Sequence, residues 1–382
     1  MAAHSHRPSS PVDPDIVVTT PGGLVACVPY LVGFVPTESL VLVFLSPPPR
    51  EIAVTLRMDL PPDTGDRGPA DDDSGVGAEP VREVVSTLAA ALDRALASNV
   101  TLDQVHLMIF SSLACRRPHG KLLRGVAEVC AARGVDVGQQ LAVHGDRMWT
   151  YDCPDEACCP VEGLPVVDDA STRAVFSLVS AGVGYVPDRA TLEQSVLPDA
   201  DGAVAPAELE EARCARDEAE QRGRGARWRR RVEDGLAGSV RTHFDEAKLR
   251  DQAAVWAVGL ADSRVREPFM YRLLVALSGD VRRRRLQLAR EWLTALVRML
   301  DGPEVAPAAA TLAALVWQAG DGAFAVIAAQ RALAADPDNR LASLINAAAG
   351  SGLPPRQWTE VLGTFTLAGL RRPSACASGP AA

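Results

Sequence analysis

The stretch Leu40–Leu45, LVLVFL, decides the fold of the first half of the chain. All six side chains are apolar, so both faces of an extended segment would be buried. That pattern is typical of a central strand in a sheet covered on both sides. The run Pro47–Pro49 forces a turn, and the apolar side chains of residues 52–58 then alternate with small or polar ones. This alternation predicts a second strand whose two faces differ.

The residues before this strand predict a helix that begins at Thr20-Pro21. Threonine can cap a helix, and proline suits the first helical position. Pro29 is expected to end or kink this helix, because proline removes a backbone hydrogen bond from a helix interior.

The segments after the second strand complete an α/β pattern. Gly145-Asp146 has the composition of a two-residue hairpin turn, and Gly134 is expected to end the helix before it. The order of the elements predicts a mixed sheet with helices packed on it. The further strands are expected at 104–110, 141–144 and 147–152, and the helices at 81–97 and 121–133.

Strand patterns stop near residue 205, and an all-helical domain is expected after it. Residues 306–339 resemble one tetratricopeptide-like helix pair, with Gly320 at the turn and Asp336-Pro337 at the end. The expected parts are a disordered arm at 1–14, an α/β domain at 15–200 with an acidic flexible loop at 61–80, a helical domain at 205–370 and a loose tail at 371–382. The helices of the helical domain are expected at 207–234, 246–260, 264–278, 281–300, 307–318, 321–335, 339–349 and 355–369.

Composition narrows the class of protein. A formal net charge of −9 favours solubility and argues against broad nucleic-acid binding by the whole chain. The first residues lack the apolar core of a secretory signal, and no apolar run approaches the ~20 residues of a membrane span. We therefore expect a cytoplasmic protein with no membrane contact. In a reducing compartment, its 8 cysteines favour metal binding, redox chemistry or simple burial over structural disulfides.

Several segments of the chain together resemble an actinobacterial family that is classified only as a domain of unknown function. The family pattern begins with a TTPGxL segment and VPYLxGFxPxxSLV, continues with RxDLP, and then carries RxWxYxC followed by CCPxxG. The resemblance covers nearly the whole chain and implies no activity. The matching residues here include Thr20, Pro21, Pro29, Tyr30, Phe34, Ser39, Arg57, Asp59, Arg147, Trp149, Tyr151, Cys153, Cys158, Cys159, Pro160 and Gly163.

The cluster Cys153, Cys158 and Cys159 carries the clearest chemistry in the sequence. Three thiolates within seven residues would be a strong start for a zinc site, which needs four ligands. Adjacent cysteines can face one ion only if the chain bends sharply, for which Pro160 is a candidate. His144 is expected across the hairpin from Arg147, about 20 Å from Cys153. A fourth ligand would therefore come from Cys115, Cys130 or a distant histidine.

Two other interpretations of the cluster stay open. The thiols can brace a tight loop by burial, or they can serve redox chemistry or a local disulfide between Cys153 and Cys158. Reactive thiolates are favoured by nearby positive charge. The surrounding acids are instead expected to raise the pKa of the thiols and to suit a bound cation. These acids are Asp152, Asp155, Glu156 and Glu162.

Other polar residues are weaker candidates. Arg147, Trp149 and Tyr151 are considered as the lining of a pocket beside the cysteines. We place Arg57 and Asp59 on opposite faces of the end of the second strand and expect a structural ion pair at the sheet edge. His106 is expected in the core or at its edge, and neither a serine-nucleophile elbow nor a phosphate-binding loop is present in the sequence.

Arginine runs mark the helical half. The first surrounds Trp228, and the second spans Arg282–Arg285. Acidic residues lie on the same predicted helix as the first run. They favour a helix surface whose arginines are solvated or paired with these acids. The leading hypothesis is a non-enzymatic interaction or regulatory protein whose helical half binds a protein partner. One alternative is a metal- or thiol-dependent module or enzyme built on the cysteines. The other is weak nucleic-acid binding through the arginines. The arginines of the first run are Arg227, Arg229, Arg230 and Arg231.

Overall fold

The structure is a computed structural model that describes residues 18–61, 78–97, 100–113, 118–151, 153, 155–180, 183–199, 203–350, 353 and 355–372. The predicted arm at 1–14, most of the predicted acidic loop and the tail beyond 372 lie outside the described residues. The described residues form two compact units, one up to Thr191 together with Leu353, and one from Leu192 onward.

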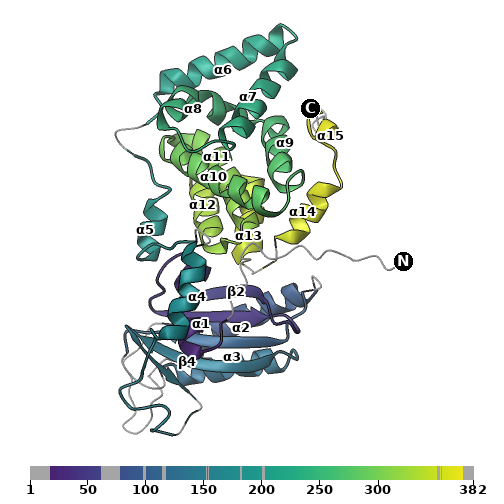
Figure 1. The fold of residues 1–382 in the computed structure, drawn as a ribbon. Helices are drawn as coiled ribbons and strands as arrows, with labels where there is room; N and C mark the ends of the chain where they lie inside the picture. The colour runs from purple at the N-terminus through teal and green to yellow at the C-terminus, as the bar shows by residue number, and fades with distance from the viewer. Residues whose placement is uncertain are drawn as a thin grey trace, which may run out of the picture. The chain divides into compact units, whose positions relative to one another are not determined.

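A mixed sheet forms the centre of the first unit (Figure 1). Its six strands lie in the order β2-β1-β3-β4-β5-β6, and β3 and β4 are parallel while the other neighbours are antiparallel. The mixed sheet of the predicted α/β half is confirmed. The strands are β1 (Ser39–Leu45), β2 (Ile52–Asp59), β3 (Gln104–Phe110), β4 (Asp136–His144), β5 (Arg147–Thr150) and β6 (Leu164–Pro165).

Strand β1 contributes to a core on each face of the sheet, as its composition predicts. Leu40, Leu42 and Phe44 pack in a cluster with side chains of α2 (Ala78–Ala97) and α3 (Gly120–Ala131). Val41 and Val43 point the other way because side chains alternate along a strand. They pack with Leu24, Val25 and Val28 of α1 (Pro21–Val32), and α4 (Asp169–Ser180) contacts α1 in turn.

Helix α1 begins where the sequence predicts it. The Oγ1 atom of Thr20 accepts a hydrogen bond of 3.0 Å from the backbone N–H of Gly23, and Pro21 occupies the first turn. Of the two expectations for Pro29, a kink stays a prediction and an end of the helix is wrong, because the helix continues to Val32. Gly33, with a left-handed φ of 83°, closes it by donating to the carbonyl of Pro29.

The hairpin between β4 and β5 is also confirmed. His144 pairs with Arg147, and Gly145 adopts the positive φ of 58° that this tight turn requires. Strand β5 ends at Thr150, where the chain leaves the sheet before the first cysteine of the cluster.

The second unit is mostly helical. Helix α11 (Val305–Gln318) is apolar on all sides and is buried among the surrounding helices. No helix in the described part of the chain combines the length and apolar character that a bilayer span requires. The other helices are α5 (Arg189–Gln194), α6 (Pro206–Gln221), α7 (Gly225–Ser239), α8 (Glu246–Ala261), α9 (Ser263–Leu274), α10 (Gly279–Arg298), η1 (Gly302–Glu304), α12 (Gly322–Ala335), α13 (Arg340–Gly350), α14 (Arg356–Gly363) and α15 (Leu367–Leu370).

Two predicted helices are each divided in the structure. The helix expected at 207–234 breaks at Gly223, whose φ of 69° is left-handed and cannot continue a helix. The acidic run and the arginine run therefore lie on different helices, α6 and α7. The helix expected at 355–369 divides into α14 and α15.

Helices α11 and α12 pack against each other around the predicted turn at Gly320, whose φ is 91°. Ala325 and Ala332 are fully buried, so small side chains permit close packing there. The likeness of this pair to a tetratricopeptide unit stays a prediction.

Candidate functional site

The three clustered cysteines lie in the connection between β5 and β6, which we call the cysteine loop (Cys153–Gly163). Their Sγ atoms all lie within 4.8 Å of one another, so the thiols of Cys153, Cys158 and Cys159 can together hold a metal ion. Cys159 is buried, Cys153 is half-buried and Cys158 is exposed. The group is therefore open to solvent on one side.

The bend that brings the adjacent cysteines together comes from Asp155. Its carbonyl oxygen accepts a hydrogen bond of 2.8 Å from the N–H of Cys159, and its carboxylate accepts one of 2.9 Å from the N–H of Ala157. The same carbonyl oxygen lies 3.8 Å from the Sγ atom of Cys153, which donates to it. Pro160, the predicted source of the bend, instead accepts the N–H of Gly163 in the next turn. The expectation about Pro160 is thus corrected.

The thiols of the loop differ in acidity. Hydrogen bonds from the thiols of Cys153 and Cys159 raise the pKa of Cys158 above its ordinary value. Burial acts to raise the pKa of Cys159, but hydrogen bonds from Thr150, Cys153 and Cys158 outweigh burial and lower it. The hydroxyl of Thr150 lies only 2.8 Å from the Cys159 sulfur. The neighbouring thiols raise the pKa of Cys158, and Thr150 together with these thiols lowers that of Cys159. The expected effect of the acids is not among the causes, and Cys159 is favoured as the first thiolate to form.

Arg147, Trp149 and Tyr151 use their polar groups to hold backbone. Trp149 donates through Nε1 to the carbonyl of Val161 at 2.9 Å, and Arg147 donates to the carbonyl of Gly163 at 3.2 Å. The hydroxyl of Tyr151 donates to the carbonyl of Pro118. The first two bonds fasten the far end of the cysteine loop to β5. This geometry favours an anchoring role over the predicted pocket lining.

The predicted fourth ligands are not brought to the cluster where the structure describes them. The Nδ1 atom of His144 donates to the carbonyl of Ser111 at 3.0 Å. Cys130 is a residue of α3 that packs in the core, where burial raises its pKa to about 11. Cys115 and Asp152 lie outside the described residues.

Arg57 and Asp59 form an ion pair of 2.7 Å at the end of β2. They lie on one face, and the expectation of opposite faces was wrong because residues two apart on a strand share a face. Arg57 also donates to the hydroxyl of buried Ser39 at 2.9 Å and stacks over the ring of Phe34. Four strand spacings of about 4.8 Å, roughly 19 Å, separate β2 from β5, so this pair does not line the cysteine site.

His106 accepts a hydrogen bond of 2.9 Å from the N–H of Gln139 through Nδ1. Burial and the charge of Arg50 lower its pKa. The imidazole is therefore neutral at pH 7 and serves the packing of β3 against β4, consistent with the expected core or edge position.

A second candidate lies in the helical unit. A surface cavity of about 660 Å³, which we call the arginine groove, follows the start of α7. Six arginines and two acids line it, so its lining carries a formal charge of +4 (six positive charges minus two negative charges). The lining residues are Ala226, Arg227, Arg229, Arg230, Arg231, Glu233, Asp234, Arg264 and Arg371.

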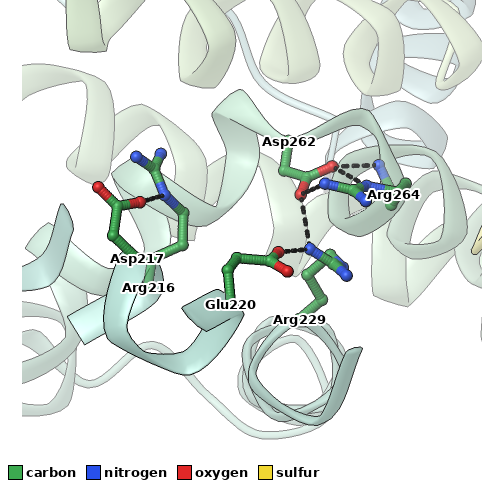
Figure 2. A network of polar contacts seen from close by, with 6 residues as sticks. All are labelled: Arg216, Asp217, Glu220, Arg229, Asp262 and Arg264. Carbon is green, nitrogen blue, oxygen red and sulfur yellow. Dashed lines mark hydrogen bonds and ion pairs between the residues drawn. The ribbon is translucent and has the colours of Figure 1, made fainter. Parts of the chain in front are cut away.

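Two acids that are not themselves part of the groove lining hold two of these arginines (Figure 2). Arg229 lies between Glu220, with which it forms an ion pair, and Asp262 at 3.5 Å. Arg264 binds Asp262 through two bonds of 2.9 Å. Burial acts to raise the pKa of Asp262, but the bonds and charges of Arg264 and Arg229 lower it below its ordinary value. Gly225 permits this arrangement, because a side chain there would meet the carboxylate of Glu220.

Glu233 orders the other end of the groove. Its carboxylate is 1% exposed and accepts bonds of 2.6 and 2.8 Å from Arg371, and Arg272 lies 3.3 Å away. Arg272 also binds Asp234 at 2.7 Å. A buried carboxylate thus fixes the segment after α15 against α7.

Arg227, Arg230 and Arg231 differ from these paired arginines. They are exposed, and the described part of the chain offers none of them a carboxylate within ion-pair distance. Their spacing of three and four residues puts them on one face of α7. The sequence marks this run but not Arg264 or Arg371, which come from distant segments with no shared local pattern.

Comparison with known proteins places the chain in a family without adding an activity. No curated protein and no solved structure matches it. A family model described as "Domain of unknown function (DUF4192)" matches residues 21–356, which include the sheet, the cysteine loop and the groove residues of α7 and α9. The chain therefore belongs to this domain family of unknown function.

Proposed function

We propose that this protein is a non-enzymatic interaction protein that binds an acidic segment of a protein partner in the arginine groove. The observation that carries the proposal is the face of α7 formed by Arg227, Arg230 and Arg231, which are exposed and have no carboxylate partner among the described residues. Elsewhere in the same groove, arginines are matched by carboxylates.

The paired arginines support binding by pre-ordering the groove. Arg229 is 13% exposed and Arg371 is 22% exposed, and each is held by an acid behind it. A guanidinium fixed in this way loses little conformational entropy when it binds a carboxylate, and it can do so through two parallel bonds. The groove therefore combines rigid guanidinium groups that are paired with acids and exposed, unpaired positive charge on the face of α7.

Charge and lining chemistry favour a carboxylate-rich protein segment over nucleic acid. Single-stranded nucleic acids bind on aromatic side chains that stack with bases. Of the residues that line the groove, none is aromatic. The chain as a whole carries −9, which repels a long polyanion outside the groove. The neighbouring pair α11–α12 is proposed as a tetratricopeptide-like unit, since stacked helix pairs commonly present binding surfaces.

The test uses the full chain and a fluorescent peptide of alternating Asp and Glu. We expect measurable binding that weakens with added salt, because the contacts are between exposed charges. The triple variant Arg227→Glu, Arg230→Glu and Arg231→Glu is expected to lose it. Crosslinking of the intact protein to cellular partners, followed by the same comparison, extends the test to natural ligands.

The matched control changes Arg94, Arg284 and Arg340 to Glu. These arginines are exposed and are not among the residues that line the groove, and this variant alters the net charge by the same amount. Equal losses in the two triple variants would show that net charge alone attracts the peptide and would refute the groove. Preference for single-stranded DNA over the peptide at matched charge would support the nucleic-acid alternative.

A further inference from the structure

We infer that Cys153, Cys158 and Cys159 form a zinc site in the cysteine loop with one coordination position open to solvent, independently of the arginine groove. A tetrahedral zinc ion with Zn–S bonds of about 2.3 Å separates its sulfur ligands by about 3.8 Å. The three Sγ atoms already lie within 4.8 Å of one another. Small rotations of the side chains therefore suffice to bring the sulfurs to bonding distance.

The surrounding backbone holds this geometry without help from an ion. The turn at Asp155 directs Cys159 back toward Cys153. The bonds from Trp149 and Arg147 fix the end of the loop. Gly163 has a φ of 78°, and a Cβ atom there would lie 2.6 Å from the Trp149 ring, so the close contact needs glycine. Ligands held on a rigid scaffold favour binding because little order is lost.

The hydroxyl of Thr150 also suits a thiolate at Cys159. It lies 2.8 Å from the buried Cys159 sulfur and can donate to it when the thiol is ionised. Hydrogen bonds of this kind orient metal ligands and stabilise their charged form. The Thr150 hydroxyl is therefore placed to orient Cys159 as a ligand.

The number of converging thiols favours a metal ion over a disulfide. A disulfide uses two cysteines and leaves the third without a role, whereas three converging sulfurs match a thiolate site for a soft ion. Asp155, Glu156 and Glu162 on the same loop add negative charge that favours a cation over an oxidised thiol pair.

Binding is balanced by proton release. Each of the three thiols gives up one proton as its sulfur bonds to Zn²⁺, so three protons leave and the zinc with three thiolates carries a charge of −1. The fourth position opens toward the exposed Cys158 side, where water completes the coordination. Because protons are released, zinc affinity is expected to rise with pH.

The experiment titrates the full chain with zinc alone under reducing conditions and measures bound metal and released protons. We expect one zinc per chain. Cys158→Ser removes an exposed ligand with little risk to folding and is expected to weaken binding about 100-fold or more, while Thr150→Val weakens it about 10-fold. The control is Cys214→Ser, an exposed cysteine on α6, which should leave affinity unchanged.

Four results would overturn the inference. They are a folded protein that takes up no zinc, equal zinc binding by the wild type and Cys158→Ser, uptake of Cu(I) with no uptake of zinc, and a Cys153–Cys158 disulfide that persists in reductant. Replacement of zinc by Co²⁺ provides an independent readout, because thiolate ligation gives a charge-transfer absorption that Cys158→Ser should weaken and Cys214→Ser should not.

Discussion

The cysteine loop and the arginine groove are assembled in opposite ways. The three cysteines lie within seven residues, and one turn brings them together. The groove draws arginines from α7, α9 and the segment after α15, which are separated by up to 144 residues (227 to 371). A local sequence pattern can therefore reveal the first site, whereas only the folded helical unit reveals the second.

The two sites also differ in how polar groups are balanced. In the cysteine loop, the polar atoms of Trp149 and Arg147 bond to backbone carbonyls and hold one conformation. In the groove, buried acids hold some arginines while a face of α7 is left without acids. The loop thus has the character of a brace, and the groove has the character of a binding surface on a braced base. Substitutions in the cysteine loop and in the arginine groove should therefore have separable effects on stability and binding.

The largest effect is expected from Glu233→Ala. It removes the buried carboxylate that binds Arg371, while Arg272 keeps its ion pair with Asp234. The loss of the buried partner should lower the free energy of unfolding by about 3 kcal/mol. Chemical denaturation of the full chain measures the change. Asp234→Ala is the control, because this exposed neighbour forms a surface pair worth under about 1 kcal/mol. Similar losses in both variants would contradict a special role for the buried acid.

A slightly smaller loss is expected from Gly163→Ala in the cysteine loop. The left-handed backbone costs an alanine about 1 kcal/mol, and the collision with the Trp149 ring adds about 1–2 kcal/mol. Gly145→Ala is the matched control. Gly145 also has a positive φ, but a Cβ atom there would meet no atom within 4 Å. Thermal unfolding should therefore separate the two. Equal shifts would mean that the ring moves aside and that the loop is less rigid than we argue.

Asp262→Asn tests the ion pairs of Asp262 with Arg229 and Arg264 through the pH dependence of stability. The folded pKa of Asp262 is lowered, so its ionised form stabilises the fold above the ordinary carboxyl pKa of 3.8. That contribution is lost as pH falls below 3.8 through the folded pKa. We expect the variant to be less stable than the wild type by about 2 kcal/mol at pH 7. The two should converge in denaturation experiments once the pH falls below the lowered folded pKa of Asp262. A difference independent of pH would exclude the ion pairs as its cause.

Much of the α/β unit could be predicted from local pattern. The six apolar residues of β1, the cap at Thr20 and the hairpin at Gly145 each depend on short-range rules, and each is confirmed. The break at Gly223 was missed because an isolated glycine is tolerated in a helical pattern, and only its left-handed φ reveals the end of α6.

For the two sites as well, local features could be predicted from the sequence and long-range contacts could not. Sequence spacing identified Cys153, Cys158 and Cys159, but the turn that joins them depends on a carbonyl oxygen of Asp155, which has no side-chain signature. Arg264 and Arg371 reach the groove through tertiary packing, and Glu233 is one acid among many in the sequence. Convergence of distant charged residues is set by the fold and leaves no periodic pattern.

The smallest effect on stability is expected from Arg227→Gln with Arg230→Gln. Like charges three residues apart on a helix repel by about 0.2–0.5 kcal/mol, so the double variant should be as stable as the wild type or more stable by about that amount. Binding of the acidic peptide should nevertheless weaken, as measured by fluorescence anisotropy. If the variant instead lost stability and kept its affinity, these arginines would stabilise the helical unit and not bind the peptide. The contrast between the two sites would then fail.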